Sequence, residues 1–121
     1  MPSPRLQGSR WERRAESFLR KRGLKPLERN FYSRFGEIDL VMLDGRVLVF
    51  VEVRYRRSDR FGSGAETVSR AKQLKLVTAA RFYLGRNRQH GDRPCRFDVV
   101  SIGQGPRGTE LDWIRDAFDA G

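Results

Sequence analysis

Three carboxylates lie on two neighbouring segments at a spacing that could hold a metal ion. Glu37 and Asp39 belong to an apolar segment, and Glu52 belongs to the next one, with the turn dipeptide Asp44-Gly45 between them. Asp-Gly between two apolar runs is among the strongest short-range sequence signals for a β-hairpin. Such a hairpin would bring Glu52 beside the two earlier acids.

The length of the loop decides how these acids face one another. If the turn dipeptide is a two-residue loop, Glu37 lies opposite Glu52, and Asp39 lies diagonal to Glu52 at about 7–8 Å. Because side chains alternate along a strand, the three carboxylates and Arg54 share one face of this hairpin. A three-residue loop with a bulge would shift the pairing.

Clustered carboxylates of this kind are typical of a site for a divalent cation. Like charges opposite each other destabilise a sheet unless a cation or a proton intervenes. Mg²⁺ and Mn²⁺ bind carboxylates together with phosphate oxygens of a substrate, which predicts phosphodiester hydrolysis. Arg54 would then stabilise the charge of the transition state. The alternative is a solvated sheet face on which Arg54 bridges Glu37 and Glu52 as surface ion pairs.

The overall charge indicates an anionic polymer as the partner. Lys and Arg number 25 against 15 Asp and Glu, for a net charge of +10, and 21 of the 25 are Arg. Arg binds phosphate oxygens bidentately, and neutralising phosphates releases counterions. We therefore expect nucleic acid as the partner. The alternative is that the charge only maintains solubility.

Length and composition exclude several classes of protein. We expect a flexible arm over residues 1–8 and one domain over residues 9–121. The longest unbroken apolar run is Val47–Val51, whereas a membrane helix needs about 20 apolar residues. The single Cys95 cannot form a disulfide framework, which indicates a reducing compartment and hence the cytoplasm. The single His90 excludes a His-rich zinc site.

The elements that must position the acids follow from periodicity and turn signals. Ser9 and Glu12 have the spacing of a capping box, which predicts a helix that begins at Ser9 and ends near Gly23. The further expected elements are strands over 27–32, 37–43, 46–56 and 96–102, a helix over 65–84, and a last segment over 110–120 that ends as a short helix. This order predicts an α/β fold with a mixed central sheet flanked by helices.

Several phrases of the sequence, taken in order, carry a family resemblance over residues 8–118. They are Glu12-x-x-Ala15 with Phe18-Leu19, Arg29-Asn30, Phe35-Gly36-Glu37-Ile38-Asp39-Leu40-Val41, Phe50-Val51-Glu52-Val53, Phe61-Gly62, Lys72 and Arg96-Phe97-Asp98-Val99-Val100. Together they resemble the bacterial YraN-type endonuclease-like family. Asp39 followed by Glu52-Val53-Arg54 also resembles the D…(D/E)-x-K signature of restriction-endonuclease-like nucleases, with Arg in the Lys position.

The resemblance implies an α-β-β-β-α-β core similar to Holliday-junction resolvases, and metal binding by Asp39 and Glu52. In such nucleases the motif Lys orients or activates the attacking water. The pKa of Arg54 is too high for a general base, although Arg can stabilise phosphate charge. Two hypotheses follow: a Mg²⁺- or Mn²⁺-dependent nuclease acting on branched or repair-intermediate DNA, and a catalytically degenerate nucleic-acid-binding module. The resolvase likeness also suggests a homodimer.

Two further residues have a functional and a structural interpretation. Glu12 matches a helix acid that completes the metal site in related nucleases, but the capping box with Ser9 also explains it. Lys72 falls at helical spacing with apolar residues that should face the sheet, namely Val68, Leu76, Ala79 and Tyr83. The opposite face of this helix, with Leu74, Val77 and Leu84, is nearly as apolar and is the alternative. Lys72 could therefore extend along apolar surface, or it could reach the acids or a phosphate and supply the cation that Arg54 replaces.

Basic residues around the acids are candidates for contact with the nucleic-acid backbone. The predicted nucleic-acid-binding residues are Arg34, Arg56, Arg57, Arg60 and Lys75. Solubility is the alternative role for this basic surface. Tyr32, Arg34 and Tyr55 could stack on unpaired bases, or they could form the rim of the core.

Overall fold

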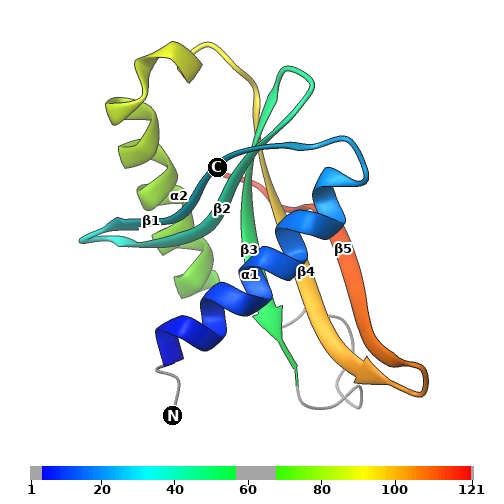
Figure 1. Cartoon of the computed structure of the whole chain (residues 1–121). Helices are drawn as coiled ribbons and strands as arrows, with labels where there is room; N and C mark the ends of the chain where they lie inside the picture. Colours follow the sequence, from blue (N-terminus) through cyan, green and yellow to red (C-terminus); the bar gives the residue numbers. More distant parts are fainter. Residues whose placement is uncertain (1–3, 57–67, 121) are drawn as a thin grey trace.

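A five-stranded mixed sheet with a helix on each face forms the molecule (Figure 1). The computed structural model describes residues 4–56 and 68–120. Its elements are α1 (Pro4–Arg20), β1 (Lys25–Ser33), β2 (Gly36–Asp44), β3 (Val47–Tyr55), α2 (Arg70–Arg86), the 3₁₀ turn η3 (Arg88–His90), β4 (Cys95–Gly105) and β5 (Gly108–Phe118). This arrangement confirms the predicted α/β class and is consistent with an α-β-β-β-α-β core followed by one more strand.

The sheet order is the chain order, β1-β2-β3-β4-β5. All neighbouring strands are antiparallel except β3 and β4, which are parallel. A parallel pair needs a crossover connection, and α2 is part of it. The crossover therefore brings the N-terminal end of α2 near the C-terminal end of β3, where Glu52 and Arg54 lie.

The two faces of the sheet carry separate hydrophobic clusters because side chains alternate along β3. Leu48 and Phe50 pack with α2, whereas Val49 and Val51 pack with α1. The apolar stripe predicted on the second helix faces the sheet: Leu76, Ala79 and Tyr83 are all buried. Lys72 therefore lies on the sheet-facing side of α2, one turn before Leu76.

The predicted start of the first helix is wrong. Helix α1 begins at Pro4, so residues 4–8 of the expected arm are helical and Ser9 lies inside the helix. Proline is well accommodated in the first helical turn, where its missing N–H leaves no hydrogen bond unmade. A residue inside a helix cannot be its N-cap, so the capping box does not explain Glu12. Residues 1–3 lie outside the described part of the chain.

The second helix also begins later than expected. Helix α2 starts at Arg70, and Ser69 is its N-cap, whose Oγ accepts a hydrogen bond from the Lys72 N–H at 3.1 Å. The expected start at residue 65 is therefore wrong, since Val68 and Ser69 are not helical. Residues 65–67 lie outside the described residues.

The last segment is a strand and not a helix. Strand β5 pairs with β4 through a tight hairpin in which Gly105 lies opposite Gly108, and Gly108 has a φ of 106°. The positive φ favours glycine, so the Gly/Pro segment closes a turn between two strands. Leu111 and Trp113 pack against the cluster on the α1 face, which supports the strand.

The β2–β3 register differs from the prediction by two residues. Asp44 pairs with Val47, so the loop consists of Gly45 and Arg46, with Gly45 at a φ of 60°. The paired residues of β2 and β3 extend from Asp44 and Val47 to Leu40 and Val51. Continuing this register by one residue brings Asp39, and not Glu37, beside Glu52. Because the shift is even, it does not exchange the two faces of the strand.

Within residues 4–56 and 68–120, no helix is long and apolar enough to cross a membrane.

Candidate metal and phosphate site

Asp39 occupies an irregular point of strand β2. Ile38 packs in the cluster with α2, whereas Leu40 packs in the cluster with α1, although a regular strand would place both on one face. The neighbouring strand is also irregular there, because Asn30 has a φ of 56°. The simple alternation that predicted one shared face for all the acids therefore fails at Asp39.

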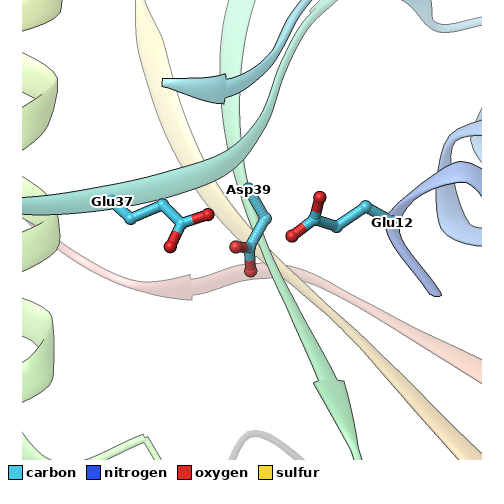
Figure 2. A group of neighbouring side chains, drawn as sticks. All are labelled: Glu12, Glu37 and Asp39. Atoms are coloured by element: carbon cyan, nitrogen blue, oxygen red, sulfur yellow. The ribbon is translucent and has the colours of Figure 1, made fainter. Parts of the chain in front are cut away.

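Three carboxylates converge at this point. Oxygen atoms of Glu12, Glu37 and Asp39 all lie within 4.8 Å of one another. Figure 2 shows Glu37 and Asp39 extending from β2 while Glu12 reaches toward them from α1. Glu12 is only 5% exposed, and its Oε2 atom is buried without a hydrogen-bond partner among the described residues. A buried carboxylate oxygen in this state is well suited to a cation.

The electrostatics of the cluster favour protonation when no cation is present. Burial, and next the charge of Glu52, raise the pKa of Asp39 to about 9, although the Val53 N–H donates to Asp39 Oδ2 at 2.8 Å and opposes this rise. Burial and then the charge of Glu37 raise the pKa of Glu12. Carboxylates crowded in this way ionise together only if a positive charge compensates them.

Glu52 joins the cluster from β3 and connects it to α2. It is 8% exposed, and its Oε1 atom lies 3.5 Å from Lys72 Nζ. Burial raises the pKa of Glu52, while the charges of Lys72 and Arg54 oppose the rise. Of the two interpretations of Lys72, the structure favours the one in which its ammonium group reaches the acids.

A cavity of about 350 Å³ adjoins Glu52. Its lining residues are Glu52, Val53, Arg54, Tyr55, Ser69 and Lys72. Arg54 and Lys72 thus border the same space as a cluster carboxylate. A phosphate group in this cavity would meet both cations and would lie next to the acids.

The predicted nucleic-acid-binding residues lie in different places. Arg34 is exposed in the β1–β2 turn, with its guanidinium 5.1 Å from the centre of the Phe35 ring. Lys75 is exposed on α2 near this turn, since a Cβ on Gly36 would lie 3.4 Å from the Lys75 carbonyl oxygen. Arg56 forms an ion pair with Asp112 of β5 at 3.0 Å.

The structure therefore does not bring all of the predicted basic residues to the acids. Arg54 and Lys72 line the same cavity as Glu52. In contrast, Arg34 and Lys75 lie near the β1–β2 turn, and Arg56 forms an ion pair with Asp112 of β5. Arg57 and Arg60 lie outside the described residues.

Two residues at the site had no predicted role there from the sequence. Asn30 hydrogen bonds with Glu12, which partly opposes the rise in the Glu12 pKa, and Ser69 combines the N-cap of α2 with a place in the cavity lining. Asn tolerates positive φ better than most residues, so Asn30 inside a strand was a usable signal. Ser69 could have been found as an N-cap candidate.

The donor set fits a hard divalent cation such as Mg²⁺ or Mn²⁺. All of the clustered groups offer carboxylate oxygens, which these ions prefer, and no sulfur or imidazole takes part among the described residues. Glu12, Glu37 and Asp39 could hold the ion directly. Glu52, beside Asp39, could complete the set and face the cavity.

Comparison with known proteins identifies the family. Residues 11–102 match the family model described as "Uncharacterised protein family UPF0102". A UPF0102 protein of Nitrosomonas europaea is 51% identical over 119 residues, covering 98% of each chain. UPF0102 proteins of Chromohalobacter salexigens (96% of this chain, 93% of the relative) and Xanthomonas oryzae pv. oryzae (99% and 98%) are each 50% identical. The chain therefore belongs to the UPF0102 family, which is the YraN-type family that its sequence resembles.

Proposed function

We propose that this protein is a metal-dependent phosphodiesterase that acts on nucleic acid, with DNA as the expected polymer. The observation that carries the proposal is the convergence of Glu12, Glu37 and Asp39 within 4.8 Å on a chain with a net charge of +10. A protein that only coats nucleic acid gains nothing from clustered carboxylates directed at its ligand. A metal-using phosphodiesterase requires them.

The roles of the residues follow from their positions. A bound Mg²⁺ or Mn²⁺ would polarise the phosphate and lower the pKa of its water. Glu12, Glu37, Asp39 and Glu52 would hold the ion. Lys72 and Arg54 would bind the scissile phosphate in the adjoining cavity, and they would stabilise the charge that develops on it.

Lys72 supports a catalytic interpretation despite the Arg at position 54. A guanidinium does not exchange protons at neutral pH, so Arg54 cannot act as the motif Lys would. The Lys72 amine, however, lies 3.5 Å from Glu52 and lines the same cavity as Arg54. Lys72 thus supplies from α2 the amine that the strand motif lacks.

Kinship with restriction-endonuclease-like enzymes is part of the same proposal. The order of elements and the positions of Asp39 and Glu52 on adjacent strands support it. Action on branched or repair-intermediate DNA in the cytoplasm, by a homodimer that carries one site per protomer, is the corresponding biological proposal.

The second candidate function is a nucleic-acid-binding module without catalysis. Arg54 favours this alternative, because it replaces the residue that activates water in related nucleases. The same acids and cations would then bind a metal and a phosphate without turnover.

A cleavage assay separates the two candidates. Labelled single-stranded, duplex and four-way DNA are incubated with the protein in Mg²⁺ or Mn²⁺, alongside Asp39→Ala, Glu52→Ala and Arg54→Lys. The nuclease proposal predicts cleavage that falls by at least about 100-fold in either acid variant. Asp112→Ala is the matched control, because Asp112 is an exposed acid on β5 that pairs with Arg56.

The outcomes are distinct. Cleavage that survives both acid substitutions contradicts the site. Binding without cleavage, with activity gained in Arg54→Lys, identifies the module instead.

A further inference from the structure

Two aromatic rings form a stacked pair at the edge of the site. The ring centres of Trp11 on α1 and Tyr55 at the end of β3 lie 4.8 Å apart, and the ring planes are inclined by only 12°. Tyr55 nevertheless remains 44% exposed. Because one face of the ring lies against Trp11, most of this exposure belongs to the opposite face and the outer edge.

Both residues of the stacked pair are close to residues of the acid site, Trp11 in the chain and Tyr55 in the cavity lining. Trp11 directly precedes Glu12, so α1 carries both the buried Glu12 carboxylate and the ring that stacks on Tyr55. Tyr55 lines the same 350 Å³ cavity as Glu52 and Lys72. The Tyr55 ring lies on the α1 side of β3 with Trp11, whereas Arg54 precedes it on the opposite side of the strand. A nucleic-acid strand that passes over the end of β3 could therefore place a phosphate in the cavity and the neighbouring base on the ring.

The surroundings of the pair are basic. Arg10, Arg13 and Arg14 are exposed on α1. Arg14 follows Trp11 by three residues and is therefore its neighbour on the helix surface. A ligand that matches exposed arginines, a phosphate-sized cavity and an aromatic ring carries both phosphates and planar bases.

We propose that Tyr55, supported by Trp11, stacks on an unpaired nucleobase adjacent to the phosphate in the cavity. The site would therefore take single-stranded or locally unpaired nucleic acid in preference to intact duplex. In a duplex both faces of an internal base are already stacked on its neighbours, whereas an unpaired base can offer one face to an aromatic ring. This inference rests on the proposed function in taking nucleic acid as the ligand and the cavity as the place of its phosphate.

A binding experiment tests the stacking directly. Three labelled ligands of about 12 nucleotides are compared in EDTA, which prevents metal-dependent cleavage: an oligothymidine strand, a duplex, and an abasic strand with the same phosphates. The protein variants are Tyr55→Ala and Tyr55→Phe. Phe82→Ala is the control, because Phe82 is a 37% exposed aromatic about 15 Å along α2 from Lys72.

Stacking on a single base predicts a specific pattern. Tyr55→Ala should weaken binding of the oligothymidine strand by about 5- to 100-fold, and Tyr55→Phe should stay within about twofold of the wild type. Neither variant should change the affinity for the abasic strand or the duplex. Wild-type affinity of Tyr55→Ala for oligothymidine, or an equal loss on all three ligands, would overturn the proposal.

A second measurement uses the wild-type protein and does not depend on the folding of a variant. A 5-bromodeoxyuridine strand is cross-linked to the protein by light, and the modified residue is mapped. The proposal predicts a cross-link at Tyr55, and a cross-link confined to other residues contradicts it. Neither measurement requires cleavage, so failure of the nuclease proposal and failure of base stacking give different results.

Discussion

The surroundings of Asp98 and Asp39, two acids among the described residues, differ in the partners that they offer each carboxylate. Asp98 on β4 is fully buried, and it accepts hydrogen bonds from the Arg96 guanidinium, the Trp113 indole N–H and the Asp116 backbone N–H, all between 2.9 and 3.0 Å. Asp39 on β2 is surrounded mainly by other acids. A buried acid whose hydrogen-bond donors are all present supports the fold, whereas a partly buried acid with mostly acidic neighbours is suited to binding a cation.

The largest expected effect on stability comes from substitution of Asp98. Asp98→Ala removes the buried acceptor of the Trp113 N–H, the Asp116 N–H and Arg96, although Arg96 keeps its ion pair with Asp44. The free energy of unfolding should fall by about 3–5 kcal/mol. Urea denaturation measures this change. Asp112→Ala, which removes an exposed acid paired with Arg56, should change stability by less than about 1 kcal/mol. Equal effects of the two substitutions would contradict the structural role of Asp98.

Asp39→Asn should change the free energy of unfolding in the opposite direction. The amide keeps an acceptor for the Val53 N–H and is neutral at every pH, whereas the Asp39 carboxyl, with a pKa of about 9, must take up a proton on folding at pH 8. The free energy of unfolding of the metal-free protein at pH 8 should therefore rise by at least about 1–2 kcal/mol. Mg²⁺, which should raise the melting temperature of the wild type, should no longer raise that of the variant. A loss of stability in Asp39→Asn would show that the carboxylate supports the fold as Asp98 does.

The stability of the metal-free protein should depend on pH in a defined direction. The pKa of Asp39 is higher in the folded state, about 9, than its ordinary value of 3.8. A group whose pKa is raised by folding stabilises the folded state. This contribution is fully present at pH values below the pKa of the unfolded state, and it is lost as the pH rises through the pKa of the folded state. Stability should therefore decrease between these two values, by at most about 1.4 kcal/mol per pH unit for this group.

Thermal unfolding across this pH range checks the slope. Mg²⁺ should make the stability less dependent on pH, because a bound cation favours the charged carboxylates. Asp39→Asn should also reduce this pH dependence. A wild-type stability that rises with pH over this interval would contradict the electrostatic account.

The smallest expected effect concerns Lys72. Its side chain is 44% exposed, so Lys72→Met should change stability by less than about 1 kcal/mol. Removal of a positive charge 3.5 Å from Glu52 should, however, tighten Mn²⁺ binding by about threefold. Lys75→Met, one turn further along α2 and exposed, is the matched control and should leave the Mn²⁺ affinity unchanged. Weaker Mn²⁺ binding in Lys72→Met would contradict the placement of Lys72 beside the metal ligands.

The sequence was informative where a local pattern agrees with the tertiary structure. Alternating residues on β3 and the stripe of α2 predicted the two faces of the sheet and the position of Lys72. The turn dipeptide predicted the hairpin, but not which two residues form its loop: Gly45 and Arg46 do so, because Asp44 still pairs with Val47. This small difference decides whether Glu37 or Asp39 lies beside Glu52.

The remaining errors come from interactions that are distant in sequence. Ser9 with Glu12 matched a local capping pattern, yet α1 begins at Pro4, and Glu12 is buried by contact with β2. The last segment pairs with β4 as a strand, and the burial of Trp113 against the α1 face is not visible in local propensity. No local pattern predicts that β2 loses its alternation at Asp39.

Direct measurement of metal binding tests the central claim. Titration of the protein with Mn²⁺ near pH 7, followed by calorimetry, should show saturable binding with release of protons, because Asp39, with a pKa of about 9, must give up its proton to bind the ion. Asp39→Asn and Glu12→Gln should each weaken this binding by at least about tenfold, whereas Asp112→Asn should not. Mn²⁺ binding of undiminished affinity in both Asp39→Asn and Glu12→Gln would contradict the assignment of this cluster as the metal centre.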